Sequence, residues 1–277
     1  MLRSLFTIAF LPLLFAPAAF AVDGVLEINE ASVAAAGGFP FSISQAGSYR
    51  LTGNLTVPAS TNGIEASVDG VRIDLNGFTL AGQGSCAATL DGDGKLISVS
   101  CTNTSGIGVS GASRVSNGTV RGFGTGFSGV PGRAVEIDRM TFTENFTGLL
   151  GVSGGGSVRI TNSLFSLSAQ DGASCLSLAG TTTVLDSTFE RNGTRGIYLG
   201  AGLARNSSFH QNGTEGIRSN ASRSALIESN YFEDNTWGIF GNISVGYRGN
   251  VFFDNTTNIN ANPVNLGGNL CDTVVCP

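Results

Sequence analysis

The sequence predicts an all-β protein that winds into a single-stranded parallel β-helix, a solenoid with a cap at each end. Four lines of sequence nearly repeat between Val184 and Asn262, each line alternates apolar and polar residues, and glycine occupies 40 of 277 positions. A repeat of about 20 to 23 residues is typical of solenoid proteins. Alternation with period two predicts strands, and so many glycines disfavour helices.

Three positions recur in each line: an aromatic residue, an asparagine three residues later, and an isoleucine four or five residues after that. These positions are Phe189, Phe209, Phe232 and Phe252, then Asn192, Asn212, Asn235 and Asn255, then Ile197, Ile217, Ile239 and Ile259. Equivalent strands of successive turns lie about 4.8 Å apart, so equivalent side chains stack in columns. We expect the Phe and Ile columns to point inward and to form a continuous core.

The asparagines of the repeat are expected at a bend between strands. Stacked amides there hydrogen-bond along the column and satisfy the backbone of the turns, as Asn ladders do in other stacked β structures. The alternative is that these asparagines are ordinary turn residues without a ladder.

The N-terminal segment Met1–Ala21 reads as a signal peptide. Arg3 provides the positive charge, an apolar stretch follows, and Ala19–Ala21 gives a small-x-small cleavage site. A membrane-spanning helix is the weaker alternative, because Pro12 and Pro17 interrupt the apolar run. No later stretch is long and apolar enough to span a membrane. We therefore expect export, to the periplasm, the cell surface or the medium.

The mature chain divides into three expected segments. Residues 22–60 form an N-terminal cap and the first strands, with a short helix within Leu26–Gly38 that ends at Gly37 and Gly38. Residues 61–262 form the turns of the solenoid, and residues 263–277 form the C-terminal cap. Caps are needed because solenoid ends expose strand edges and apolar core.

Export permits disulfide bonds between the five cysteines. Cys86 and Cys101 flank a predicted β-hairpin, and Cys271 and Cys276 close a short C-terminal loop, so we expect these two pairs to be bridged. Cys175 is left over, and a buried free thiol is favoured over a nucleophile because no partner histidine is identifiable. A zinc site is not expected, since the chain has no CxxC and one histidine.

Several stretches resemble a known family. GSYRLTGNLTV, VRIDLNGFTLAG, the N-x-F-x-x-N-x-x-G-I lines and the terminal NLCDTVVCP are similar to bacterial secreted right-handed parallel β-helix repeat proteins of the pectate-lyase-like group. The resemblance covers nearly the whole mature chain and implies right-handed winding. It leaves the activity open, because this fold hosts lyases, hydrolases, epimerases, esterases and adhesins.

The active-site patterns of the polysaccharide-active relatives are weak or missing here. Ala134–Met140 is faintly similar to a pectate lyase stretch, but Glu136 and Arg139 replace its Trp and His. The Asp pair and GHG of polygalacturonases do not occur, nor does a pectin methylesterase signature. The DGDG turn from Asp91 suggests calcium but lacks the further ligands of an EF-type loop, so no cofactor or metal is predicted.

The residues that follow each Phe form one outward column: Thr143, Ser166, Glu190, His210, Glu233 and Phe253. Glu190, His210 and Glu233 then lie on successive turns, with the carboxylates roughly 10 Å apart. Such a separation is close to that of inverting glycosidases, so these three residues are candidate catalytic groups. The alternative is a solvated face on which a histidine lies between two acids.

A second outward column follows the Ile positions: Leu150, Ser177, Tyr198, Arg218, Phe240 and Asn260. Tyr198, Arg218 and Phe240 are candidate ligand-binding residues, because rings and a guanidinium suit an acidic polysaccharide. The alternative is scattered surface aromatics. A third column, Arg205, Glu228 and Arg248, is interpreted as a surface ion ladder that contributes little per pair.

Composition narrows the function classes. The net charge of −5 and the lack of a basic stripe in the linear sequence argue against nucleic-acid binding. No concentrated His, Lys and Asp cluster is visible, which favours a non-catalytic glycan-binding or envelope protein. We expect a monomer. The alternative is a polysaccharide lyase or glycoside hydrolase that acts on an acidic polysaccharide.

Overall fold

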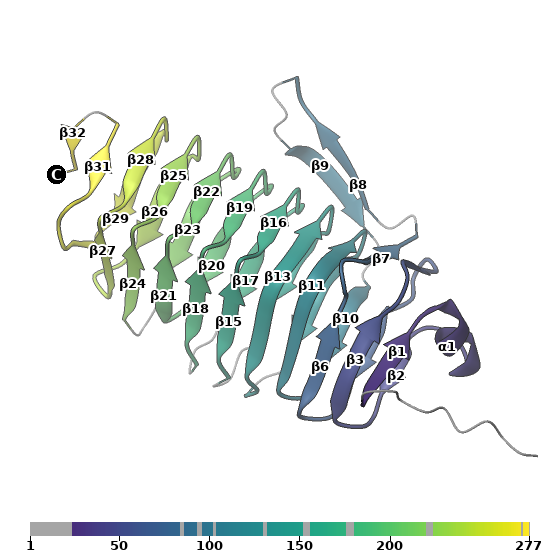
Figure 1. Ribbon diagram of the computed structural model, residues 1–277. Helices are drawn as coiled ribbons and strands as arrows, with labels where there is room; N and C mark the ends of the chain where they lie inside the picture. The colour runs from purple at the N-terminus through teal and green to yellow at the C-terminus, as the bar shows by residue number, and fades with distance from the viewer. Residues whose placement is uncertain are drawn as a thin grey trace, which may run out of the picture.

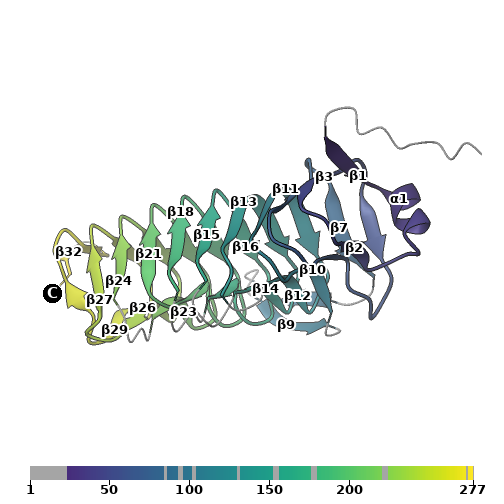
Figure 2. The ribbon, with the colours of Figure 1, turned by 90° about the horizontal axis from the view of Figure 1, so that it is seen from below.

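The protein is a parallel β-solenoid, as the sequence predicts. The computed structural model describes residues 24–83, 86–92, 96–101, 104–129, 132–151, 156–175, 180–219, 224–272 and 274–276. Successive turns stack along one axis, with a short helix at the N-terminal end and the C-terminus at the opposite end (Figures 1 and 2). Each turn contributes strands to three faces.

The first and second faces meet at a corner. The first face consists of β1 (Val25–Ile28), β3 (Gly47–Leu51), β6 (Val71–Asp74), β15 (Val158–Thr161), β18 (Thr182–Leu185), β21 (Gly202–Arg205), β24 (Ala225–Glu228), β27 (Val245–Arg248) and β30 (Val264–Asn265). The second consists of β4 (Leu55–Val57), β7 (Thr79–Gly82), β16 (Leu164–Ser166), β19 (Thr188–Glu190), β22 (Ser208–His210), β25 (Tyr231–Glu233), β28 (Val251–Phe253), β31 (Leu270–Cys271) and β32 (Val274–Val275). Two long strands, β11 (Ser113–Arg121) and β13 (Val135–Thr143), run through the corner and join both faces into one hydrogen-bonded sheet.

The third face is a separate sheet in which neighbouring strands are parallel. It consists of β2 (Phe41–Ile43), β5 (Ile64–Ala66), β10 (Ser105–Val109), β12 (Thr125–Gly129), β14 (Thr147–Leu150), β17 (Ala173–Cys175), β20 (Ile197–Leu199), β23 (Glu215–Ser219), β26 (Trp237–Gly241) and β29 (Thr257–Ala261).

The predicted Phe column is confirmed and forms the centre of the core. Six rings stack on successive strands of the second face, with centroids 4.9–5.1 Å apart, and all are fully buried: Phe142, Phe165, Phe189, Phe209, Phe232 and Phe252. The Ile column of the third face is buried at Ile197, Ile217 and Ile239, whereas Ile259 on the last turn is only partly buried. The core is therefore continuous along the axis and thins at the C-terminal end.

The expected Asn ladder is present at the corner between the second and third faces. Nδ2 of Asn192 donates to Oδ1 of Asn212 at 2.9 Å, Asn212 donates to Asn235 at 3.0 Å, and Asn235 donates to Asn255 at 2.9 Å. Each Oδ1 also accepts the backbone N–H of the preceding asparagine of the ladder. The ladder thereby provides hydrogen-bond partners for the buried asparagine amides and for backbone N–H groups of the corner.

A second ladder, which the repeat pattern did not predict, occupies the corner between the first and second faces. Its members are Ser163, Ser187, Ser207, Asn230, Asn250 and Asn269. The side-chain oxygen of each member accepts hydrogen bonds from the residue at the same position on the preceding turn. For example, Oδ1 of Asn250 accepts from the backbone N–H of Asn230 at 3.0 Å and from its Nδ2 at 3.1 Å. The residue before each member has a left-handed φ between 50° and 71°, for example 51° at Asp186 and Asn206. Short polar side chains favour this conformation.

The N-terminal end is closed by α1 (Glu30–Ala35). Asn29 and Ser32 form a capping box, and Val33 packs into the core. The helix is shorter than Leu26–Gly38, because Leu26–Ile28 pair with β3 as a strand. Gly37 and Gly38 end it with φ of 96° and 102°, as expected from the αL preference of glycine.

The cysteines occupy three separate places. β8 (Cys86–Leu90) and β9 (Leu96–Cys101) form the expected hairpin, whose register sets Cys86 opposite Cys101, although the side chains of this proposed bridge lie outside the described part. Cys271 and Cys276 are joined by a disulfide with an S–S distance of 2.03 Å. Cys175 is a free, buried thiol, and desolvation raises its pKa to about 12.

The predicted signal peptide, residues 1–21, also lies outside the described residues. Among the helices that the structure describes, none is long and apolar enough to cross a membrane.

Candidate functional site

The outward column of the second face follows the predicted order. Thr143, Ser166, Glu190, His210, Glu233 and Phe253 are partners on successive strands. The strands β19, β22 and β25 bring the three candidate catalytic residues together, because each of these residues stands one position after a buried Phe. Their side chains therefore point away from the core by strand alternation.

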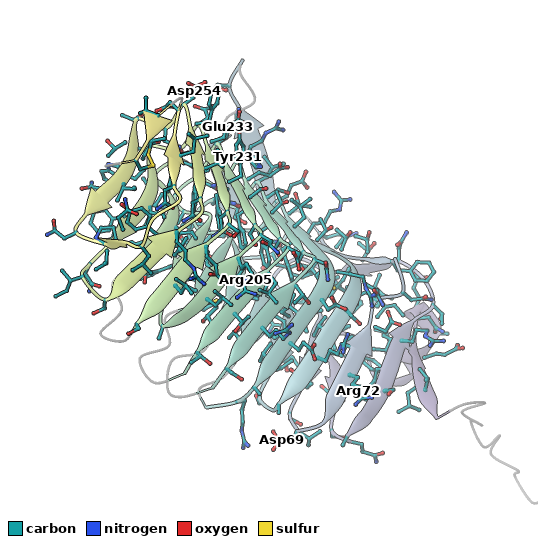
Figure 3. The ribbon with its side chains drawn as sticks, turned by 60° about the vertical axis from the view of Figure 1, so that its left-hand side comes forward. Asp69, Arg72, Arg205, Tyr231, Glu233 and Asp254 are labelled. Atoms are coloured by element: carbon teal, nitrogen blue, oxygen red, sulfur yellow. A yellow bond between two sulfur atoms is a disulfide. The ribbon has the colours of Figure 1, made fainter. Side chains whose placement is uncertain are left out.

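His210 and Glu233 are in direct contact. Nδ1 of His210 lies 3.2 Å from Oε2 of Glu233, and the ring of Tyr231 lies 5.6 Å from the imidazole. The three residues line or border an open cleft of about 510 Å³, whose lining residues are Glu190, Arg191, His210, Gln211, Glu233, Asp234 and Asp254. Figure 3 shows Tyr231, Glu233 and Asp254 close together toward one edge of the solenoid.

The cleft is predominantly acidic. Desolvation raises the pKa of Tyr231, and the charge of Glu233, a hydrogen bond to Glu233 and the charge of Asp254 raise it further. The phenol of Tyr231 contacts the carboxylate of Glu233, which in turn contacts the imidazole of His210. Such an arrangement can accept and donate protons. The negative charge favours neutral or cationic ligands in this cleft over polyuronates. In the part of the chain that the structure describes, no three His, Cys, Asp or Glu residues are placed to hold a metal ion.

The candidate binding strip on the third face is also formed, with one correction to its register. Tyr198, Arg218 and Phe240 are partners on β20, β23 and β26. Ser174, not Ser177, is the partner of Tyr198. The predicted alignment failed there because the inward position of this turn holds Ala173, where the following turns hold an isoleucine, so the pattern did not mark it. Residues 176–179 lie outside the described part.

Arg218 interleaves with the rings of the strip. Its guanidinium lies 4.8 Å from the centroid of Phe240 and 6.0 Å from that of Tyr198. The guanidinium of Arg195 lies over the ring of Tyr198, 4.9 Å from its centroid, and Trp237 packs at a tilt against Phe240 with centroids 5.6 Å apart. These cation–π contacts hold the strip as a rigid unit.

Both arginines of the strip have acidic partners that sequence reasoning missed. Arg218 Nη1 lies 3.0 Å from Oε1 of the buried Glu215, and Arg195 makes a bidentate pair with the buried Asp171 at 2.8 and 3.0 Å. Desolvation raises the pKa of Asp171, although Arg195 opposes this shift. The strip therefore combines rings and guanidinium groups with little net charge.

The third predicted column is an ion ladder on the first face. Arg205, Glu228 and Arg248 are partners on successive strands, and Arg248 Nε donates to Glu228 Oε2 at 2.8 Å while Arg205 bonds the other oxygen. The hydrogen bond from Arg248 and the charges of both arginines lower the pKa of Glu228 despite its desolvation.

The fold also assembles a basic column that the linear sequence did not reveal. Arg72 and Arg114 are direct partners on β6 and β11, and Glu136 and Arg159 follow on β13 and β15. Two adjoining clefts of about 350 and 370 Å³ lie over these residues. Four similar segments, VRID, SRVS, VEID and VRIT, could have indicated this column in the sequence. The hairpin inserted between VRID and SRVS hides their common register.

Most of the chain matches the model of one protein family. The model described as the right handed beta helix region matches residues 59–204 and 125–271, which together cover most of the chain. No curated protein matches the sequence.

Solved structures support the same fold at low identity. The Dettilon tailspike protein is similar with a TM-score of 0.59 and 13% identity, over 82% of this chain and 50% of that one. An alginate lyase from Paenibacillus sp. FPU-7 is similar with a TM-score of 0.51 and 12% identity, over 90% of this chain and 97% of that one. The chain thus spans about half the length of the tailspike but nearly all of the lyase, and at these identities the likeness establishes the fold alone.

Proposed function

Because the chain belongs to the right-handed β-helix family, we propose that it is an exported protein that binds an acidic polysaccharide without cleaving it. Export is inferred from the predicted signal peptide at Met1–Ala21 and from the disulfide between Cys271 and Cys276, since such bonds persist in oxidising compartments. The periplasm, the cell surface and the medium all fit this proposal.

The observation that carries the proposal is the alternation of rings and guanidinium on the third face. Arg218 is held between Tyr198 and Phe240 and is fixed by Glu215. The strands beneath are hydrogen-bonded to both neighbours, so the strip is ordered before a ligand arrives. Preorganised groups lose little entropy on binding, which allows a modest surface to bind a repeating polymer weakly.

The ligand chemistry follows from the exposed parts of these side chains. Ring edges and faces that point outward contact the apolar side of a sugar, and the remaining guanidinium N–H groups donate to a carboxylate. Because Glu215 offsets much of the charge of Arg218, the attraction is short-ranged, and we expect added salt to weaken binding only moderately.

Affinity electrophoresis in gels that contain polygalacturonate, with dextran as the neutral reference, tests the proposal. Tyr198→Ala and Arg218→Ala should each weaken retardation about 3- to 10-fold, as loss of a stacking or charge-assisted contact does. Leu150→Ala is the matched control, because Leu150 stands in the same outward column and is 45% exposed. Unchanged binding by both strip variants would mean that the strip is ordinary surface.

The second candidate is a polysaccharide lyase or glycoside hydrolase at Glu190, His210 and Glu233. The contact of 3.2 Å between His210 and Glu233 within an open cleft favours it. Incubation with alginate, polygalacturonate and neutral glucans, followed by ultraviolet absorbance for unsaturated ends and a reducing-end assay, decides between the two. If the wild-type protein releases product and His210→Ala and Glu233→Gln abolish this release, the catalytic proposal replaces the non-catalytic one.

A further inference from the structure

The N-terminal turns of the first face carry arginines in unusual surroundings. Arg72 stands directly opposite Arg114 on the next strand, and like charges placed opposite each other destabilise a sheet. Arg114 is balanced by Asp138 at 3.0 Å and Glu136 at 3.5 Å. Among the described residues, Arg72 and Arg159 have no ion-pair partner within 4 Å, and both side chains are exposed.

These arginines surround the two adjoining clefts. Arg72 and Arg114 line both clefts, Arg50 lines the cleft of about 350 Å³, and Arg159 lines the cleft of about 370 Å³. Nε of Arg50 is buried and has no hydrogen-bond partner in the described structure, with the nearest carboxylate, Asp74, 3.8 Å away. Figure 3 shows Arg72 on the N-terminal turns, well separated along the solenoid from Arg205.

Asp138, which lies beside the clefts, holds Arg114 in place with a contact of 3.0 Å. Desolvation alone would raise the pKa of Asp138, but hydrogen bonds from Thr161 and Asn162 and the charges of Arg139 and Arg114 outweigh it and lower the pKa. Asp138 therefore fixes Arg114 from one side and leaves Arg72 and Arg159 uncompensated. The local surface is basic on a protein whose net charge is −5.

We propose that this N-terminal cleft, defined by Arg50, Arg72, Arg114 and Arg159, binds the carboxylate groups of an acidic polysaccharide. The guanidinium fork matches a carboxylate in two parallel hydrogen bonds. Arginines on successive or alternate strands, about 4.8 and 10 Å apart, engage several residues of one polymer chain. The class of ligand rests on the proposed glycan-binding function, whereas the site is a different face of the solenoid.

The lining favours a glycan over a nucleic acid. Ser48, Ser116 and Asp74 provide groups that hydrogen-bond sugar hydroxyls. The aromatic residue of the cleft, Tyr49, is only 5% exposed and donates to the carbonyl of Gln45, so it offers no face on which a base can stack.

The test is the affinity of the full mature chain for polygalacturonate at two salt concentrations, with heparin, single-stranded DNA and dextran as comparison probes. The double variant Arg72→Ala/Arg159→Ala should bind polygalacturonate about tenfold more weakly and with a smaller salt dependence. Arg72→Lys/Arg159→Lys should recover only part of the affinity, since lysine keeps the charge but not the fork. Arg121→Ala, on the second face, removes one exposed charge and should bind as wild type.

The outcomes separate this site from the strip on the third face. Loss of binding in the arginine double variant but not in Tyr198→Ala supports the cleft even if the strip has no role. The reverse result keeps the proposed function and overturns the cleft. Tighter binding of DNA than of polygalacturonate, or wild-type binding by a double variant with an unchanged circular dichroism spectrum, also overturns it.

Discussion

The corner between the first and second faces is built differently in the two halves of the solenoid. In the C-terminal turns the corner position holds a serine or asparagine, such as Ser187 or Asn230, whose oxygen accepts a backbone N–H of the preceding turn. In the N-terminal turns the equivalent positions are Met140 and Gly118, within the long strands β13 and β11. One half closes its corner with hydrogen bonds, and the other with close packing.

The difference has consequences for both shape and function. At Gly118 an added Cβ would lie 2.3 Å from Cβ of Leu75 and 2.7 Å from the carbonyl oxygen of Phe78, so backbones approach closely there. The C-terminal half, with its repeated polar corner, carries regular short strands and the columns that the sequence predicted. The N-terminal half departs from the repeat, and its irregular turns carry the hairpin and the basic clefts.

The largest expected effect concerns the Phe column of the C-terminal half. Phe209→Ala should lower the free energy of unfolding by about 3–5 kcal/mol, because it opens a cavity between two stacked rings in a fully buried core. Glu190→Ala, on the outward column, should change it little. Chemical denaturation measures both, and equal small losses would contradict the assignment of the core.

A smaller loss is expected at the Asn ladder. Asn212→Ala should cost about 2–3 kcal/mol, because it leaves buried partners in Asn192, Asn235 and the carbonyl of Phe189 without their hydrogen bonds. Thr183→Ala, on the outer side of the first face, provides a control. Hydrogen exchange should show the amide of Asn192 among the most affected, and unchanged protection there would argue against the ladder.

The packed corner of the N-terminal half is tested by Gly118→Ala, expected to cost about 1–3 kcal/mol as other overpacked sites do. Gly53→Ala is the matched control, since an added Cβ at Gly53 meets no atom within 4 Å. If Gly118→Ala unfolds at the same denaturant concentration as the control, the two halves do not differ in the way that we infer.

The smallest effect concerns acid stability at the ion ladder. The pKa of Glu228 is lowered in the folded protein from its ordinary value of 4.5. The ionised Glu228 therefore stabilises the fold above pH 4.5, and this stabilisation is lost as the pH falls through the folded pKa. Glu228→Gln should therefore be less stable by about 1 kcal/mol or less near neutral pH and converge on the wild type in acid. Thermal melts across that range measure it, and parallel pH profiles would contradict the linkage.

The sequence predicted some parts of the candidate site and of the corners, but not others. The stacking of Glu190, His210 and Glu233 followed from the position after each Phe, because strand alternation fixes which side chains point outward. The contact of His210 with Glu233 and the cleft beside it did not follow, since side-chain conformations depend on neighbours from other turns. The second ladder was missed because it begins with three serines and ends with three asparagines, so no single residue type marked the column.

The sequence by itself determined the solenoid, the inward Phe column, the Asn ladder and the N-terminal cap helix, because these depend on period, alternation and capping residues close together in the chain. Only the tertiary structure decided which charges meet. Arg218 acquired Glu215 as a partner, whereas Arg72 and Arg114 met across the inserted hairpin. Electrostatic neighbours of this kind depend on the register between turns of unequal length, which local patterns do not encode.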